Sequence, residues 1–301
     1  MADLIEEFKS DARTRGLAES TIVAYVSDIR EFMGFIKKPI SKVDRVDLRE
    51  YVAYLRSRGL KSKTLGYNLA AVSSFFEFLI FEEKVKSNPV LEVRKRYLKG
   101  YKTDGEGQTH KIISVDEATA MVNALVDIRD KAILILLLKT GIRLGELVSL
   151  DVKDVNFEDR RILLKSTKKR SNRLVFFDNE AAHYLRRWMV IREERASPNN
   201  PALFISSPTQ RASDSLVHRL IRKAALKIGM HDLGSDRMED HFSAHCCRHW
   251  FTTHLRRAGM PREFIQELRG DVRREAIDIY DHIDPKELRE SYLAHIPQLG
   301  I

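Results

Sequence analysis

Apolar residues recur at the spacing of an α-helix through the first 97 residues. We expect four helices in this stretch, because each segment has one apolar stripe among otherwise polar positions. The second begins near Glu19, the third follows Asp44, and the fourth runs from about Ser62 to Glu83. The four stripes consist of Ile5, Phe8 and Ala12; Ile22, Tyr25, Val26, Ile29, Phe32, Met33 and Ile36; Leu48, Val52 and Leu55; and Leu65, Leu69, Val72, Phe76 and Leu79. Four such helices can form a small bundle, so residues 1–97 are predicted to make a helical domain.

Residues 98–111 interrupt this pattern. They contain three glycines, several charges and no apolar periodicity. Segments of this composition are typical of connections between domains. We therefore expect a linker here, followed by a second domain over residues 112–301.

The second domain has a mixed pattern. Ser114, with Glu117 three residues later, predicts a capped helix start, and the segment from about Asp130 to Thr140 is apolar on most faces. Two short runs rich in β-forming residues, 162–164 and 174–177, flank a basic turn and predict a β-hairpin. Helical patterns resume at 181–194, 213–228, 244–258 and 262–268, and a C-terminal helix is expected at 286–296. The fold class is therefore mainly α with a small β-hairpin sheet.

The charge balance suggests a polyanionic partner. The net charge is +9, which favours nucleic acid over a membrane surface. Cys246 and Cys247 are the only cysteines, which fits a reducing compartment. The first residues lack the basic start and apolar run of a signal peptide, and the longest apolar run, 132–138, is too short to span a bilayer. We expect a cytoplasmic protein without a membrane partner.

Four segments contain candidate chemistry. They are TGIRLGEL at 140–147, the hairpin RRILLKSTKKRSNR at 160–173, HCCRHWFTTH at 245–254 and AIDIYDHI at 276–283. Each has an ordinary explanation when taken alone: a surface ion pair, a solvated basic turn, a partly packed helix and a core tyrosine. In the third segment, however, His245, Arg248, His249 and Thr252 share one helix face. The hairpin holds seven basic residues and no acidic one, a density that attracts phosphate.

A metal site is a competing interpretation of the third segment. His245 and His249 have the spacing of paired zinc ligands in HExxH enzymes. Cys246 stands where the catalytic glutamate of that motif would be, and Arg248 would place a cation beside the metal. Both features disfavour a metal, so we expect no metal and no cofactor.

Taken together, the four segments carry a recognisable order of residues. In that order they read arginine, lysine, His-x-x-Arg and tyrosine, which resembles the tyrosine recombinase family, also called lambda-type integrases. TGIRLGEL is similar to the first arginine box of the family, SAHCCRHWFTTHLRRAG to the second, and IQELRGD with the segment ending IYDHI to the third. The resemblance covers nearly the whole chain. It is strongest to Xer-type or archaeal integrases, and residues 1–97 resemble the helical core-binding (SAM-like) domain.

The resemblance implies a set of catalytic residues. It identifies Arg143 from the first box, His245 and Arg248 from the second, and Tyr280 from the third, with Tyr292 as the next candidate nucleophile. The catalytic lysine lies on the hairpin in this family. Alignment on Arg173, Leu174 and Val175 places it at Lys168, while Lys165 and Lys169 remain possible.

One position departs from the family pattern. The residue after Gly270 is usually histidine or tryptophan, and here it is Asp271. An ionised aspartate can only accept hydrogen bonds, and an anion aimed at the phosphate would oppose catalysis. We expect Asp271 to avoid the phosphate. It would instead orient Arg248 or His245, or cap the segment that follows.

The resemblance also implies an activity and an assembly. Tyr280 would cleave double-stranded DNA and form a 3′-phosphotyrosyl bond, the two arginines would hold the phosphate, and Lys168 would protonate the leaving oxygen. Two domains would clamp DNA, and a homotetramer would join two sites. The apolar face of the C-terminal helix (Leu288, Tyr292 and Ile296) would dock on a neighbouring protomer, with packing in its own domain as the alternative.

Two other classes of function stay open at this point. One is an architectural or regulatory DNA-binding protein that has lost catalysis, and the other is a metallohydrolase. A covalent protein–DNA adduct would separate the recombinase from the first, and metal analysis from the second. The same motifs serve enzymes that integrate mobile elements and enzymes that resolve chromosome dimers.

Overall fold

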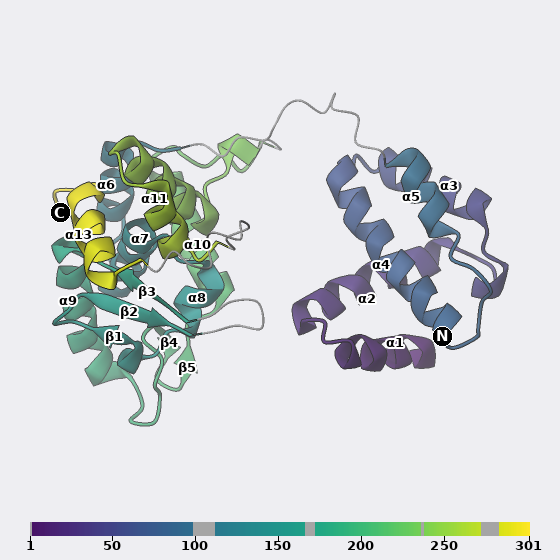
Figure 1. Ribbon diagram of the computed structural model, residues 1–301, viewed down its shortest axis with the longest axis horizontal. Coiled ribbons are helices and arrows are strands. Elements are labelled where there is room, and N and C mark those ends of the chain that lie inside the picture. Colours follow the sequence, from purple (N-terminus) through teal and green to yellow (C-terminus); the bar gives the residue numbers. More distant parts are fainter. Residues whose placement is uncertain (1, 99–111, 166–171, 236–237, 272–282) are drawn as a thin grey trace. The chain divides into compact units, whose positions relative to one another are not determined.

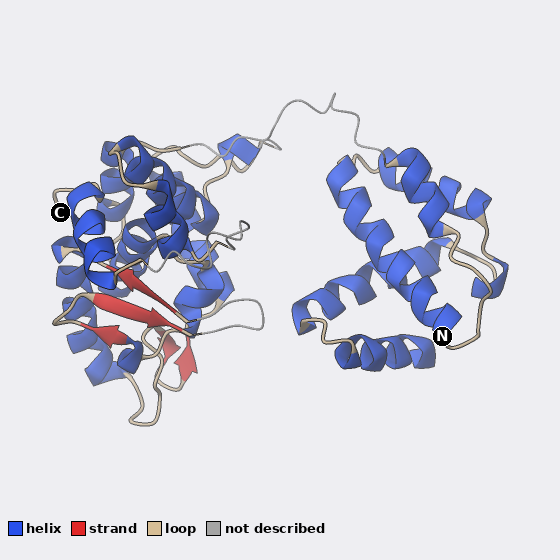
Figure 2. Ribbon diagram, in the orientation of Figure 1, coloured by secondary structure: helices blue, strands red, loops and turns tan. Residues whose placement is uncertain are grey.

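The computed structural model describes residues 2–98, 112–165, 172–235, 238–271 and 283–301. It divides the chain into two compact units, Met1–Gly107 and Gln108–Ile301. The first unit is wholly helical in its described part, and the second combines helices with two small sheets (Figure 2). The mainly helical fold class with a small hairpin sheet is therefore confirmed.

The first unit is a helical bundle around one central helix. Its elements are α1 (Ala2–Thr14), α2 (Glu19–Phe35), the short 3-10 turn η1 (Ile40–Lys42), α3 (Arg45–Ser57), α4 (Ser62–Phe81) and α5 (Val90–Tyr97). Helix α4 packs against each of the other four helices (Figure 1). The predicted helices are all present, and α5 is an additional helix that the apolar pattern did not reveal.

Helix α3 begins directly after Asp44, where the sequence predicts a helix. The carboxylate of Asp44 accepts hydrogen bonds from the backbone N–H groups of Val46 and Asp47, at 2.7 and 3.2 Å. Asp47 in turn accepts the N–H of Asp44 at 2.8 Å. This reciprocal capping box satisfies the free amides of the first turn and fixes the start of α3 at Arg45.

Helix α4 is long and apolar enough to cross a membrane by length and composition alone. Ten of its 20 residues are buried among the other helices, including Leu69, Val72 and Phe76. Its apolar composition is therefore explained by its place at the centre of the bundle.

The second unit surrounds one buried helix. Its helices are α6 (Val115–Asn123), α7 (Ile128–Thr140), α8 (Leu144–Ser149), α9 (Asn179–Arg195), α10 (Asp214–Lys227), α11 (Ala244–Arg257), α12 (Arg262–Arg269) and α13 (Pro285–His295), with 3-10 turns η2 (Val152–Asp154) and η3 (Met238–Asp240). Every residue of α7 from Ala132 to Thr140 is buried. Helices α9 and α11 pack directly against it, which confirms the buried helix expected from the sequence.

The sheets of the second unit are small and antiparallel. Strands β1 (Val155–Asn156), β2 (Arg161–Leu164) and β3 (Arg173–Phe176) form one sheet in that order. The predicted hairpin is β2–β3, with Ile162 opposite Val175 and Leu164 opposite Arg173. A second pair, β4 (Ile205–Ser207) and β5 (Gln210–Arg211), was not predicted, because strands this short show no usable periodicity.

The C-terminal residues pack into their own unit. Leu288, Tyr292 and Ile296 are each at most 4% exposed and belong to the core of the second unit. The hydroxyl of Tyr292 donates to the carbonyl oxygen of Lys139 at 2.9 Å. In the single chain, the apolar face of α13 therefore lies in its own domain, which is the alternative left open above, and docking on a neighbouring protomer stays a prediction.

A buried cluster of Lys139, Asp178 and Glu180 binds the backbone of residues 297–301. The Lys139 ammonium, which is fully buried, donates to Asp178 at 2.6 Å and to Glu180 at 2.5 Å. It also donates to the carbonyl oxygen of Pro297 at 2.5 Å. Glu180 accepts the backbone N–H groups of residues 299–301 at 2.6 to 3.3 Å. Because each charge has ion-pair and hydrogen-bond partners, these interactions offset the desolvation penalty of burying the cluster in the core.

Tyr292→Ala should strongly destabilise the second unit. Deletion of a fully buried aromatic ring typically costs about 3–5 kcal/mol, which lowers the Tm of a unit of this size by about 6–20 °C. Glu290→Ala, on the exposed side of the same helix, is the matched control and should leave the Tm nearly unchanged. Thermal unfolding followed by near-ultraviolet circular dichroism measures both. Equal Tm values for the two variants would show that α13 does not contribute to the stability of the monomer.

Candidate active site

Helix α11 places the second arginine box at the surface of the second unit. His245 is exposed, and Arg248, one turn further on, has only 4% of its side chain exposed. The rings of His245 and His249 lie edge to face with their centroids 4.6 Å apart. The helix therefore places the imidazole of His245 at the surface and the guanidinium of Arg248 beneath the surface beside it.

The other side of α11 is packed. Trp250 and Phe251 are at most 1% exposed, and Cys246 and Cys247 are buried beside them. Burial raises the pKa of the Cys247 thiol well above its usual range. Both cysteines are therefore core residues, as the sequence suggested.

Arg248 is held by three acceptors from distant parts of the chain. Its Nη1 donates to the carbonyl oxygen of Gly141 at 2.7 Å. Its Nη2 donates to the carbonyl oxygen of Arg269 at 2.8 Å and to Oδ1 of Asp271 at 3.1 Å. Burial, followed by the charges of Arg143 and Arg269, lowers the pKa of Arg248 to about 9. The guanidinium therefore remains protonated at neutral pH.

Arg143 reaches the same two acceptors from the first box. It is the residue that precedes helix α8, and 29% of its side chain is exposed. Its Nη1 donates to the carbonyl oxygen of Arg269 at 3.0 Å, and its Nη2 donates to Oδ1 of Asp271 at 3.3 Å. Arg143 and Arg248 thus converge on one carbonyl oxygen and one carboxylate oxygen.

Gly141 makes this convergence possible. It ends helix α7 in the left-handed conformation, with φ of 59°, which favours glycine. A Cβ atom at this position would lie 2.4 Å from Cδ1 of Phe251. Only glycine lets the end of α7 approach α11 closely enough for its carbonyl to bind Arg248.

A buried ion pair between Arg173 and Glu146 holds the first box in place. Arg173 on β3 donates to both carboxylate oxygens of Glu146, each at 2.9 Å. Although burial opposes it, these bonds and the backbone N–H of Arg143 lower the pKa of Glu146. Arg173 also donates to the carbonyl oxygen of Leu268 at 3.2 Å, and a Cβ atom on Gly270 would lie 2.8 Å from its side chain. Arg173 therefore ties the sheet to the first and third boxes.

Sequence reasoning missed this role of Arg173. The residue was counted among the seven hairpin cations, yet it is only 8% exposed. The available signal was its position at the inner start of the second strand, opposite Leu164. A buried cation at such a place needs an anionic partner, and Glu146 is the carboxylate that provides it.

Asp271 lies between the cations of the site. Its Oδ1 accepts from both Arg143 and Arg248, and its Oδ2 lies 3.1 Å from Nε of Arg269. The contact with Arg248 is one of those expected from the sequence, and the contact with Arg143 is an additional one. Whether Asp271 contributes to catalysis stays a prediction.

The hairpin lysines are described only in part. Lys168 and Lys169, like Tyr280, lie outside the described residues. Lys165 is described, and its ammonium donates to Asp151 at 2.6 Å and lies 3.0 Å from Asp154. The hydrogen bond with Asp151, followed by that with Asp154, raises the pKa of Lys165. A raised pKa makes a lysine a weaker proton donor, which disfavours Lys165 as the general acid.

Tyr292 is unsuited to the role of nucleophile. Its side chain is fully buried, and its hydroxyl is engaged with Lys139. Burial raises its pKa well above the usual value, so the reactive phenolate is strongly disfavoured. Tyr280 therefore stays the candidate nucleophile.

The described part of the chain contains no group of three or more histidine, cysteine, aspartate or glutamate side chains that could hold a metal ion. His245 and His249 are close together, but within these residues no third ligand joins them. The metallohydrolase interpretation therefore gains no support from the geometry.

The comparisons with known proteins identify the class. A family model described as "Phage integrase family" matches residues 111–287, and a model described as "Phage integrase, N-terminal SAM-like domain" matches residues 4–84. The chain belongs to the phage integrase family. Within it, the chain is a site-specific tyrosine recombinase of the Xer type, as the resemblance predicted.

Curated relatives support the Xer assignment. A protein named tyrosine recombinase XerC from Thermodesulfovibrio yellowstonii is 30% identical over 288 residues, covering 92% of this chain and 90% of the relative. The XerC of Vibrio parahaemolyticus is 31% identical over 265 residues, covering 85% and 78%. A XerD from Rickettsia bellii is 26% identical over 300 residues, covering 93% and 94%.

Solved structures share the fold. A lambda integrase dimer bound to a COC′ core site has a TM-score of 0.71 at 16% identity, covering 95% of this chain and 80% of that one. A Tn1549 transposon integrase in complex with transposon right end DNA has a TM-score of 0.68 at 18% identity, covering 92% and 97%. The XerA recombinase has a TM-score of 0.50 at 24% identity, covering 98% and 99%.

Proposed function

We propose that this recombinase cuts and rejoins double-stranded DNA through a covalent bond between Tyr280 and a 3′ phosphate. The observation that supports this most directly is the convergence of two guanidinium groups on one anionic oxygen. Arg143 and Arg248 come from different boxes, yet both donate to Oδ1 of Asp271. Two such forks can bind a phosphodiester and stabilise the added negative charge of its transition state.

The reaction follows from the chemistry of these side chains. The Tyr280 oxygen attacks phosphorus, forms the phosphotyrosyl bond and displaces the 5′ oxygen of the next nucleotide. His245, exposed on α11, donates to the phosphate or removes the tyrosine proton. Lys168 gives its proton to the leaving 5′ oxygen. A 5′-hydroxyl from a second duplex then attacks the phosphotyrosine and reverses the step, so the bond energy is conserved.

Asp271 acts on the arginines in this scheme and not on the phosphate. Its carboxylate contacts Arg143, Arg248 and Arg269, so it can hold the two catalytic guanidiniums in position. An anion in direct contact with the phosphate would raise the energy of the transition state. We therefore place Asp271 behind the arginines when DNA is bound.

A nicked suicide substrate tests this function. Cleavage close to a nick releases a short fragment that diffuses away, so the covalent intermediate accumulates. The expected result is a protein–DNA adduct that survives denaturant and is removed by protease. If the purified protein binds DNA but forms no adduct on genomic or random-sequence nicked DNA, it is a DNA-binding protein without catalysis.

Lys168→Ala should slow cleavage of a normal strand and have much less effect on a strand whose 5′ leaving oxygen is replaced by sulfur. A thiolate leaves without a proton, so a general acid is needed only for the oxygen. Single-turnover cleavage of both strands gives the comparison. Lys165→Ala is the matched variant and should show no such selective rescue. Equal defects of Lys168→Ala on both strands would assign the acid to another lysine, with Lys169 tested next.

We further propose that four copies assemble on two DNA sites, in the cytoplasm. The two domains, which residues 98–111 connect, would clamp each duplex. The C-terminal helix would pass to a neighbouring copy. An exchanged helix can reuse its present contacts, because a neighbour's α13 would fill the same apolar position. The mass of the complex with DNA, measured by sedimentation, should correspond to four chains and two duplexes. A complex of one chain per duplex at saturation would contradict the assembly.

A further inference from the structure

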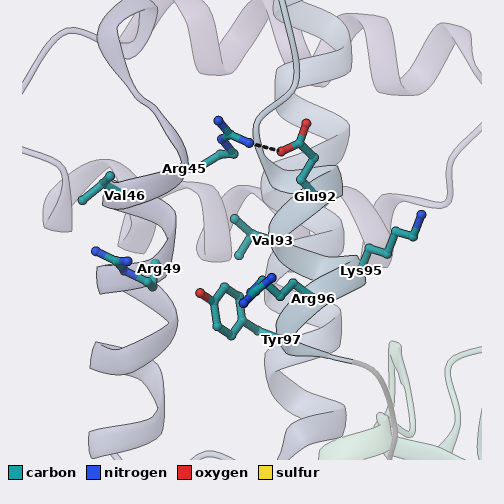
Figure 3. Close-up of a pocket in the computed structure, with 8 residues that line it drawn as sticks. All are labelled: Arg45, Val46, Arg49, Glu92, Val93, Lys95, Arg96 and Tyr97. Carbon is teal, nitrogen blue, oxygen red and sulfur yellow. Dashed lines mark hydrogen bonds and ion pairs between the residues drawn. The ribbon is translucent and has the colours of Figure 1, made fainter.

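The eight side chains that line the pocket between α3 and α5, in the first unit, include no histidine (Figure 3). Histidine is the side chain whose ordinary pKa lets it change charge between pH 5 and 8. A pair of histidines, His231 and His241, lies in the second unit, in the segment 228–243 between α10 and α11 (Figure 1). Their rings meet edge to face with centroids 4.8 Å apart. The segment leads directly into the helix that contains His245 and Arg248.

The hydrogen bonds of the pair specify its charge state. The backbone N–H of Phe242 donates to Nδ1 of His231 at 3.2 Å, so this nitrogen has no proton and the ring hydrogen is on Nε2. Nε2 of His241 lies 2.6 Å from the carbonyl oxygen of Ser235. A carbonyl oxygen can only accept, so the hydrogen of His241 is also on Nε2. The remaining contact, 3.4 Å between Nε2 of His231 and Nδ1 of His241, then joins a donor to an acceptor, and both rings are neutral.

A further proton on either ring would break this arrangement. On Nδ1 of His231 it would displace the N–H of Phe242, a residue only 3% exposed. On Nδ1 of His241 it would face the ring hydrogen of His231. Burial, followed by the charge of His241, lowers the pKa of His231. The closed arrangement therefore binds fewer protons than an opened one, and it loses stability as the pH falls below the ordinary histidine pKa of about 6.5.

Other charged groups of the segment and of α10 surround the pair. Arg222 of α10 lowers the pKa of His231, and Asp232 raises it. The backbone N–H of Asp232 donates to the carbonyl oxygen of Asp240 at 2.9 Å, which closes the base of the segment. The carboxylate of Asp240 accepts the hydroxyl of Ser235 at 2.6 Å. The aspartates therefore hold the segment together around the histidines.

The pair is joined to the first turn of α11. Phe242, which donates to His231, is buried in the core of the second unit. The carbonyl oxygen of His241 accepts the thiol of Cys246 at 3.7 Å, and the carbonyl oxygen of Ser243 accepts the backbone N–H of Cys246 at 2.9 Å. The two histidines thus hold the backbone from which α11 begins.

We propose that the neutral His231–His241 pair positions the start of α11 for catalysis, and that protonation of the pair releases it. Both histidines are positioning residues, because they act through His245 and Arg248. The proposal rests on the proposed function and makes its cleavage step sensitive to acid. His245 is an imidazole as well, so its own protonation has to be separated from that of the pair.

Hydrogen exchange of the free full chain, measured by mass spectrometry, tests the conformational step without DNA. After correction for the intrinsic exchange rate, protection of the amides of residues 241–246 should fall by about tenfold from pH 7.5 to pH 5.5. One histidine with an ordinary pKa of about 6.5 gives that factor. In the double variant His231→Asn, His241→Gln, neither side chain takes up a proton in this range. The two amides can still accept from Phe242 and donate to Ser235, so protection should be equal at both pH values.

Single-turnover cleavage of the nicked substrate at saturating protein tests the catalytic step. The ratio of the rate at pH 7.5 to the rate at pH 5.5 should be about tenfold larger for the parent than for the double variant. Protonation of His245 affects both proteins equally, so it cancels in this comparison. His183→Asn, which removes an exposed histidine of α9, is the matched control and should keep the ratio of the parent. Anisotropy at both pH values checks that DNA is bound.

Distinct outcomes overturn distinct claims. Protection that does not change with pH in the parent, or a ratio of rates that is equal in the parent and the double variant, overturns the proposal. His231→Ala removes the acceptor of the Phe242 N–H and should lose protection at both pH values, so full protection in this variant also contradicts it. If protection responds to pH as expected but no adduct forms at pH 7.5, the proposed function fails while the pair still holds the segment.

Discussion

Tyr280→Phe should bind duplex DNA with the affinity of the parent protein and form no covalent adduct with it. Affinity depends mainly on contacts with the phosphate backbone, which this change leaves intact. Phenylalanine has no oxygen, so it cannot attack phosphorus. Anisotropy measures binding, and a denaturant-resistant band on a nicked suicide substrate measures the adduct. The expected loss of adduct is complete.

Tyr67→Phe provides the matched control for this experiment. Tyr67 is 63% exposed on α4 of the first unit, and loss of its hydroxyl should leave adduct formation intact. An adduct formed by Tyr280→Phe would mean that a different side chain is the nucleophile. Tyr292 would remain excluded by its burial, so the attached peptide would have to be identified by mass spectrometry.

Arg248→Ala should slow single-turnover cleavage by about a thousandfold, which corresponds to about 4 kcal/mol of transition-state stabilisation. In the proposed mechanism the guanidinium supplies positive charge at the phosphate. Its removal also leaves the carbonyl oxygens of Gly141 and Arg269 without this donor. Near-ultraviolet circular dichroism checks that the variant is folded, and anisotropy checks that it still binds DNA. A loss of less than tenfold would show that Arg248 does not contact the reacting phosphate.

Asp271→Ala is the comparison for Arg248→Ala. If Asp271 only holds the two arginines, its removal should slow cleavage by about tenfold, or about 1.4 kcal/mol. The two arginines keep their bonds to the carbonyl oxygen of Arg269, which limits the damage. A folded, DNA-binding Asp271→Ala variant as inactive as Arg248→Ala would overturn the positioning role. Asp271 would then be the candidate base for Tyr280.

Much of the fold could be predicted because local chemistry specifies it. The helix expected after Asp44 begins there and Ser114 caps its helix as expected, and the two β-rich runs of the hairpin lie within one residue of β2 and β3. Helix α5 escaped prediction because it has eight residues with only Val90 and Val93 buried, and its remaining positions are largely charged. So short an element is stabilised by its packing on α3 and α4 and not by its own pattern.

The candidate site could be predicted only as a set of side chains. Motif order brings Arg143, Arg248 and Asp271 to attention, and the structure places them together. The shared acceptor at their centre is the backbone carbonyl of Arg269, and backbone groups have no sequence signature. The pairing of Arg173 with Glu146 spans 27 positions, and that of Lys139 with Pro297 spans 158. Contacts between such distant residues do not follow from local periodicity.

The two buried cysteines of α11 allow local opening of this helix to be followed by thiol labelling. Only the thiolate reacts with thiol reagents, and burial both hides Cys247 and raises its pKa. Labelling therefore requires α11 to leave the core, and it takes with it His245 and Arg248. Because the chain has no other cysteine, a labelling rate that is proportional to reagent concentration, compared with the rate for an unprotected thiol, gives the free energy of that opening. The intact chain thus allows the local stability of α11 to be measured without an introduced probe.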